Sequence, residues 1–134
     1  MKGSYVLVIK LDEDKNIKVG KLGDVEFKKG YYLYVGSALN GLKGRLKRHL
    51  SKDKKTHWHV DYLLNEGRIV DIYVKIGERK EECEIASYFS RKYHSIDDFG
   101  SSDCKCKSHL FFSDSKKGLI ETIRSLGMVE FGKF

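Results

Sequence analysis

The chain has 134 residues, 40% of them hydrophobic, and its 26 lysines and arginines outnumber its 19 acidic residues to give a formal net charge of +7. This length allows one core, so we expect a single domain over residues 1–134. We expect no membrane partner and a cytoplasmic protein, because no apolar run is long enough to span a bilayer and no signal peptide is recognisable. Three cysteines cannot form a complete disulfide framework, which fits a reducing compartment. The basic excess is spread along the chain and indicates a surface that binds a polyanion, with nucleic acid as the first candidate.

Segments with strand character fill the first third of the chain. Residues 5–11 carry apolar side chains on both faces, which predicts an interior strand covered on both sides. Two short strand candidates, 17–19 and 25–27, follow between polar turns, and a tyrosine-rich strand bounded by glycines covers 31–35. We expect an antiparallel meander in which the strands 5–11 and 31–35 are adjacent.

A basic helix is predicted directly after the tyrosine-rich strand, because leucines recur there at every fourth position. Arg45 and His49 lie four residues apart on one border of the leucine stripe, and Tyr34 ends the preceding strand. A phenol, a guanidinium and an imidazole can therefore converge on one phosphate. Lys43 and Lys47 flank the other border, which leaves an ordinary solvated helix surface as the alternative.

The rest of the chain alternates between predicted helices and strands. A helix is expected from His57 to about Asn65. On it His57 and Asp61 are four residues apart, a spacing at which the carboxylate either orients the imidazole or forms a plain surface hydrogen bond. His59 lies on another side of this helix. The further elements are a strand over 68–76 with one solvated face, a helix over 80–93, a loop over 97–108, a strand over 109–112, and a helix over 116–126 capped by Ser115.

Glu82 lies in the middle of the apolar face of the predicted helix 80–93. A carboxylate in that position is costly to bury unless a cation, a metal or hydrogen bonds receive it. In the first helical turn it can also reach solvent and interact with the helix dipole. We interpret Glu82 as a functional carboxylate and a candidate metal ligand, because the basic, tyrosine-bearing site elsewhere in the chain lacks one.

Cys104, Cys106 and His109 form a Cys-x-Cys-x-x-His pattern that offers three zinc-capable ligands, with Cys83 or Asp103 as a conceivable fourth. A structural zinc site usually presents two well-spaced pairs of ligands, and the sequence shows only one cluster. We therefore expect free thiols, a packed or hydrogen-bonded histidine, and no structural metal.

Several runs of the sequence resemble the GIY-YIG nuclease superfamily. Gly3-Ser4-Tyr5 and Tyr34-Val35-Gly36 stand in place of its two motifs, with Gly-Ser-Tyr replacing Gly-Ile-Tyr and a long insertion between them, and Arg45 and Glu82 follow in later helices. Longer runs are similar to a poorly characterised branch sometimes fused to DNA glycosylases of the endonuclease III type. These runs are Gly-Tyr-Tyr-Leu-Tyr-Val-Gly-Ser-Ala, His-Trp-His-Val-Asp-Tyr-Leu-Leu, Glu-Cys-Glu and Phe-Gly-Ser-Ser-Asp-Cys-Lys-Cys-Lys-Ser-His-Leu-Phe.

The resemblance implies an α+β domain with a small, mostly antiparallel sheet flanked by helices. It implies a DNA endonuclease that uses one Mg²⁺ or Mn²⁺ ion in DNA repair or processing, with a DNA repair enzyme as a partner. Glu82 would hold the metal, Arg45 would neutralise developing charge, and Tyr5 or Tyr34 would activate water with help from His49.

The expected DNA-binding residues lie on the basic helix and just after it: Lys43, Lys47, Arg48, His57 and His59. Two other classes stay open, a DNA-binding module without hydrolytic activity and a zinc-stabilised interaction domain.

Overall fold

Strand β1 (Gly3–Leu11) is the centre of the fold, and almost all of its side chains are buried. In the computed structural model, which describes residues 1–102 and 104–134, β1 pairs antiparallel with β4 (Gly30–Ala38) on one side and with β5 (Arg68–Ile76) on the other. The predictions of an interior strand over 5–11 and of its antiparallel pairing with 31–35 are confirmed.

These three strands belong to an antiparallel six-stranded sheet with the order β6-β7-β4-β1-β5-β8. Its other members are β6 (His94–Ser95), β7 (Leu110–Ser113) and β8 (Val129–Lys133). Neither β6 nor β8 was predicted: β6 has only two residues, and β8 is a largely exposed strand of five residues near the end of the chain. The predicted solvated face of β5 is wrong: Asp71 and Tyr73 are both 1% exposed, since helices cover that face as well.

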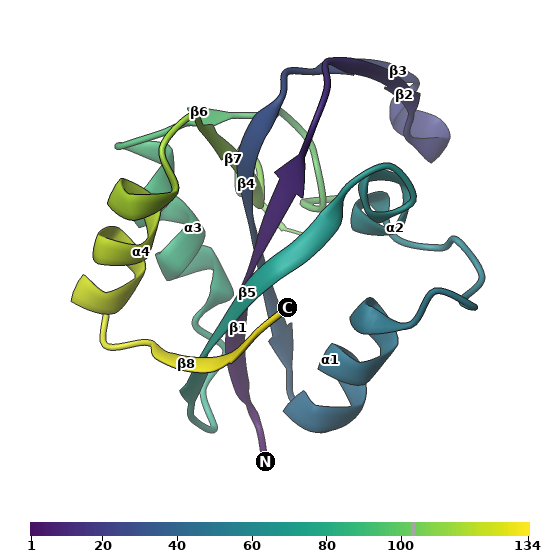
Figure 1. Ribbon diagram of the computed structural model, residues 1–134. Coiled ribbons are helices and arrows are strands. Elements are labelled where there is room, and N and C mark those ends of the chain that lie inside the picture. Colours follow the sequence, from purple (N-terminus) through teal and green to yellow (C-terminus); the bar gives the residue numbers. More distant parts are fainter. Residues whose placement is uncertain (103) are drawn as a thin grey trace.

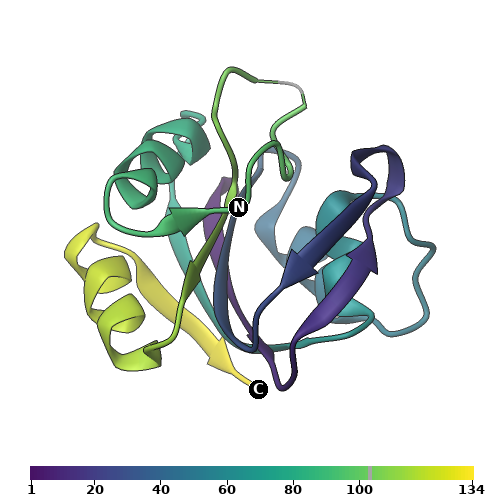
Figure 2. The same ribbon diagram turned by 90° about the horizontal axis from the view of Figure 1, so that it is seen from above.

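Helices cover the sheet on both faces (Figures 1 and 2). One face, on which Tyr5, Leu7 and Ile9 of β1 lie, packs against α1 (Leu42–Leu50) and α2 (His59–Leu64). The opposite face, with Val6 and Val8, packs against α3 (Glu82–Ser90) and α4 (Lys116–Ser125). None of the helices in the described ranges is both long and apolar enough to cross a membrane.

The segment between β1 and β4 forms a separate hairpin and not the expected meander. It consists of β2 (Lys15–Lys18), a short 3₁₀ helix (Gly20–Leu22) and β3 (Asp24–Phe27), and the two strands pair only with each other. Buried Val19 and Phe27 attach it to the core on the α2 side. The insertion between the two motif strands therefore leaves the pairing of β1 with β4 unchanged.

Helix α2 begins two residues later than predicted because Asp61 binds the backbone at its start. The Asp61 Oδ2 atom accepts hydrogen bonds from the backbone N–H groups of His57 and Trp58, each at 2.9 Å. The carboxylate therefore serves the helix N-terminus. Of the two alternatives left open for this pair, it matches neither, because the buried Asp61 side chain binds the backbone N–H of His57 and not its ring, and the bond does not lie on the helix surface. At α4 the predicted cap is confirmed, since Ser115 Oγ accepts a hydrogen bond from the Gly118 N–H at 3.4 Å.

Gly36 makes room for the ring of Tyr5. The two residues lie opposite each other in the β1–β4 register, and a Cβ atom at Gly36 would overlap the Tyr5 ring atoms. The aromatic ring crosses β4 at this point on its way to α1.

We predict that Gly36→Ala lowers the free energy of unfolding by about 1 to 3 kcal/mol, because the added methyl group overpacks the Tyr5 ring. Gly44→Ala is the matched control, since Gly44 lies inside α1 and a Cβ there meets nothing within 4 Å. This control should gain up to about 1 kcal/mol from helix propensity. Urea denaturation measures both, and a Gly36→Ala variant as stable as the unmodified protein would contradict the packing described here.

Candidate functional site

A cleft of about 600 Å³ opens where β7 leaves β4. Strand β7 pairs with β4 from Tyr31 to Tyr34, and the last bond between these segments runs from the Val35 N–H to the His109 carbonyl at 2.9 Å. The β4 residues Gly36 and Ser37 then line the cleft. The site therefore lies at the edge of the sheet where α1 and the start of α3 approach from opposite faces.

Six of the predicted site residues line this cleft, although they come from separate elements. They are Tyr5, Tyr34, Arg45, His57, His59 and Glu82. Trp58, Lys80 and His109 also line it and were not predicted as part of it. The aromatic side chain between two histidines in His-Trp-His was a signal that could have identified Trp58.

Tyr5 and His49 form a buried hydrogen bond behind the cleft, with 2.6 Å between the Tyr5 hydroxyl oxygen and His49 Nε2. The His49 ring is 2% exposed, and its Nδ1 atom has no hydrogen-bond partner within the described part of the chain. A buried N–H without an acceptor is rarer than an unpaired acceptor. We therefore assign the hydrogen to Nε2, which donates to the tyrosine oxygen and leaves the Tyr5 hydroxyl free to donate into the cleft.

Burial keeps both members of this pair uncharged. It raises the pKa of Tyr5 to about 12 against the opposing effect of Arg45, and it lowers the pKa of His49 to about 4 against the attraction of Asp61. Burial also raises the pKa of Tyr34 far above its ordinary value and lowers that of His59. At neutral pH the cleft thus presents the phenols of Tyr5 and Tyr34 and the neutral ring of His59 beside the cation of Arg45.

Arg45 is held with its guanidinium at the cleft. Its Nη1 donates to the Ser37 carbonyl at 3.0 Å, and its guanidinium carbon lies 4.6 Å from the centre of the Trp58 ring. The hydrogen bond to Ser37 uses one of five N–H donors, and the stacked ring fixes the plane of the group. Such an arrangement suits an anion such as phosphate.

The other predicted basic residues lie elsewhere. Arg48 forms a bidentate ion pair with Asp61 at 3.0 and 3.1 Å, and the Asp61 side chain is 1% exposed. Burial alone would raise the pKa of Asp61, but the hydrogen bonds from Arg48 and from the backbone of Trp58 and His57 lower it. Arg48 therefore balances a buried carboxylate, while Lys43 and Lys47 are exposed and outside the cleft lining.

Glu82 is the first residue of α3, and its side chain is 12% exposed. Its Oε1 atom lies 2.9 Å from Lys80 Nζ, so the cation expected beside this carboxylate is a lysine. Within the described lining of the cleft, Glu82 is the one carboxylate. It does not belong to the cluster of metal-capable side chains, which begins at the next residue.

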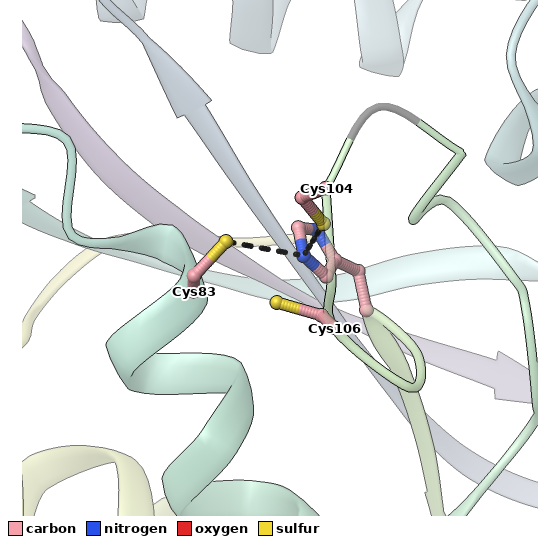
Figure 3. A group of neighbouring side chains, drawn as sticks. Cys83, Cys104 and Cys106 are labelled. Atoms are coloured by element: carbon pink, nitrogen blue, oxygen red, sulfur yellow. Dashed lines mark hydrogen bonds between the residues drawn. The ribbon is translucent and has the colours of Figure 1, made fainter.

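That cluster consists of Cys83, Cys104, Cys106 and His109, whose ligand atoms all lie within 4.8 Å of one another. Figure 3 shows the three thiols turned toward one another, one from α3 and two from the chain before β7. The expectation of an incomplete three-ligand cluster is wrong because Cys83 supplies the fourth ligand. Asp103, the other conceivable fourth ligand, lies outside the described residues.

The expectation of a Mg²⁺ or Mn²⁺ cofactor is also overturned. The donor set that the fold assembles is three thiols and one imidazole. Thiolates and imidazoles suit zinc, whereas Mg²⁺ and Mn²⁺ prefer carboxylate, carbonyl and water oxygens. The arrangement is therefore typical of zinc and not of a magnesium carboxylate site.

The comparisons with known proteins place the chain in a family without assigning an activity. The model of the family described as "Domain of unknown function DUF123" matches residues 4–129. The chain belongs to this family. Curated proteins and solved structures give no significant match.

We predict that His49 stays neutral in the folded protein down to about pH 4 and makes stability depend on pH. In the unfolded protein the His49 ring binds a proton below its ordinary pKa of about 6.5, whereas in the folded protein it stays neutral. The contribution of His49 to the free energy of unfolding is therefore fully present above about pH 6.5 and is lost as the pH falls below it. The loss should reach about 3 kcal/mol near pH 4.

Urea denaturation between pH 7 and pH 4 measures this loss. His49→Gln should flatten the pH dependence relative to the matched variant His94→Gln, whose histidine is exposed on β6. Equal pH dependence in the two variants would refute a neutral, buried His49. NMR titration of the His49 ring supplies an independent check.

Proposed function

We propose that the protein is a DNA-acting phosphodiesterase of the GIY-YIG type and that the cleft holds the scissile phosphate. The observation that carries this proposal is that Tyr5, Tyr34, Arg45 and Glu82 line one cleft although they come from two strands and two helices. These four residues stand at the positions that the resemblance to GIY-YIG nucleases singles out. A shared cleft is what a common reaction centre requires.

The cleft offers a phosphate hydrogen-bond donors and a positive charge. The Arg45 guanidinium, oriented by Trp58 and Ser37, can bind two phosphate oxygens, and the Tyr5 hydroxyl can donate to one of them. The net charge of +7 favours association with DNA over a longer range. His57 and His59 line the same cleft and would contact the neighbouring backbone or bases.

Hydrolysis requires a proton acceptor and charge stabilisation at this phosphate. The Glu82 carboxylate can accept a proton from the attacking water, whose oxygen forms the new bond to phosphorus as the bond to the leaving oxygen breaks and that oxygen takes a proton from solvent. Arg45 neutralises the negative charge that develops on the phosphate oxygens. Tyr5, backed by His49, stabilises the same charge by hydrogen bonding.

A DNA-binding module without hydrolytic activity is the second candidate. The observation that favours it is that burial raises the pKa of Tyr5 to about 12 and lowers that of His49 to about 4, so neither group exchanges protons readily at neutral pH. This candidate predicts DNA binding that weakens with salt and no cleavage of any substrate. A DNA repair enzyme as a partner and a cytoplasmic location remain predictions of the resemblance and the composition.

We predict that the protein cleaves at least one member of a panel of duplex, forked and branched DNAs, and that Glu82→Gln lowers the rate at least about 10²-fold with unchanged DNA affinity. Arg45→Ala should weaken both binding and cleavage. It should also reduce the slope of log affinity against log salt by about one, because one phosphate contact is lost. Single-turnover cleavage and fluorescence-anisotropy binding measure these effects.

Glu121→Gln and Arg124→Ala are the matched controls. Both residues are exposed on α4, which packs on the sheet face opposite α1. They should leave affinity and cleavage unchanged. Binding without cleavage across the panel would favour the second candidate, and equal effects of Arg45→Ala and Arg124→Ala would reject the cleft as the DNA site.

A further inference from the structure

The Cys83, Cys104, Cys106 and His109 cluster has the dimensions of a tetrahedral metal site. Zinc–sulfur bonds of about 2.3 Å and zinc–nitrogen bonds of about 2.0 Å place tetrahedral ligand atoms roughly 3.5 to 3.8 Å apart. Here His109 Nε2 lies 3.4 Å from Cys104 Sγ and 4.0 Å from Cys83 Sγ, and no pair of ligand atoms exceeds 4.8 Å. Small side-chain rotations bring such a set to zinc-binding distances.

The backbone holds these ligands in place from three sides. His109 is fixed by its carbonyl, which accepts from the Val35 N–H, and by its own N–H, which donates to the Phe99 carbonyl, both at 2.9 Å. Cys83 lies in the first turn of α3, which the buried Ile85 anchors to the core. The Cys104 N–H donates a hydrogen bond to the Ser101 carbonyl at 3.3 Å.

The cluster accounts for every cysteine in the chain, and none of them forms a disulfide. Three thiolates and one divalent ion carry a net charge of −1, which nearby cations stabilise. Lys105 and Lys107 line the hollow beside Cys83 and Cys106. Its described lining contains no acidic side chain. On the side of this hollow, lysine side chains and no carboxylates therefore face the cluster.

We propose that Cys83, Cys104, Cys106 and His109 bind one zinc ion, which ties the chain before β7 to the start of α3. Three sulfur ligands and one imidazole in a closed set are typical of a structural zinc site. Cys83 of α3 reaches the opposite segment through a contact of 4.0 Å between its sulfur and His109 Nε2, which a shared metal ion would replace with two metal–ligand bonds. Metal binding thus contributes directly to the stability of this part of the fold.

The zinc ion also determines the shape of one wall of the cleft. Glu82 precedes Cys83 in the chain, and His109 is both a zinc ligand and a lining residue of the cleft. Gly100 lines the cleft as well, next to the ring of Tyr34. A zinc ion at the cluster therefore fixes the position of Glu82 relative to Tyr34 and Arg45. The consequence of this position for DNA cleavage rests on the proposed function, whereas the binding of zinc itself does not.

Metal analysis of the untagged, full-length protein tests the proposal. We expect about one zinc per chain. After exchange for Co²⁺ we expect the absorption bands of tetrahedral cobalt together with thiolate-to-cobalt charge transfer. Cys83→Ser and Cys106→Ser should lose the zinc, while Ser87→Ala, one turn after Cys83 on α3, and His94→Ala should retain it. A strong chelator should lower the urea midpoint of the unmodified protein and leave that of Cys83→Ser unchanged.

The result that would overturn the proposal is a folded, unmodified protein with far less than one zinc per chain, whose three thiols react at once with a thiol reagent. This measurement decides the matter even where a cysteine variant fails to fold. Zinc-loaded protein that binds zinc through the cluster but cleaves no DNA would refute the proposed function alone. Absence of zinc from protein that cleaves DNA would refute the zinc site alone.

Discussion

The hydrogen bond between Tyr5 and His49 is the contact on which the candidate site depends. To reach His49 on α1, the Tyr5 ring crosses β4 where that strand carries Gly36. Together with the buried Leu42 and Leu46, this contact holds α1 against the sheet. Because Arg45 precedes His49 by one helical turn, it also brings the guanidinium to the end of β4. Burial of His49 is tolerated because the ring is neutral. A single tyrosine on the central strand thus connects the core to the surface where a ligand would bind.

The opposite wall of the cleft is built by a different kind of interaction. Strand β7 is short, so β4 extends beyond it and leaves an edge that α3 and the chain before β7 enclose. The Cys83, Cys104, Cys106 and His109 cluster lies at this junction. A metal ion bound there, as we propose, would tie these two segments together at the wall of the cleft.

Much of this arrangement could be predicted from the sequence. The run of apolar residues on both faces of β1, the leucine repeat of α1 and the cap of α4 are local patterns, and local patterns predict elements well. Tyr5, Tyr34, Arg45 and Glu82 were predicted to share a site through the resemblance to GIY-YIG nucleases, and they line one cleft. Cys83 was only one of two conceivable fourth ligands, and the site was expected to be incomplete, because Cys83 approaches the other ligands only in the folded chain. Spacing along the sequence does not show such contacts. Arg48 was predicted to bind DNA for the same reason, because its ion-pair partner Asp61 lies on another helix.

A crystal structure of the protein with a short DNA substrate would test the central claim most directly. The account predicts a backbone phosphate within hydrogen-bonding distance of the Arg45 guanidinium and the Tyr5 hydroxyl, with Glu82 facing the phosphorus. The DNA would then lie across the end of β4, between α1 and the start of α3. DNA bound instead along the exposed Lys43 and Lys47 side of α1, with no phosphate in the cleft, would contradict it.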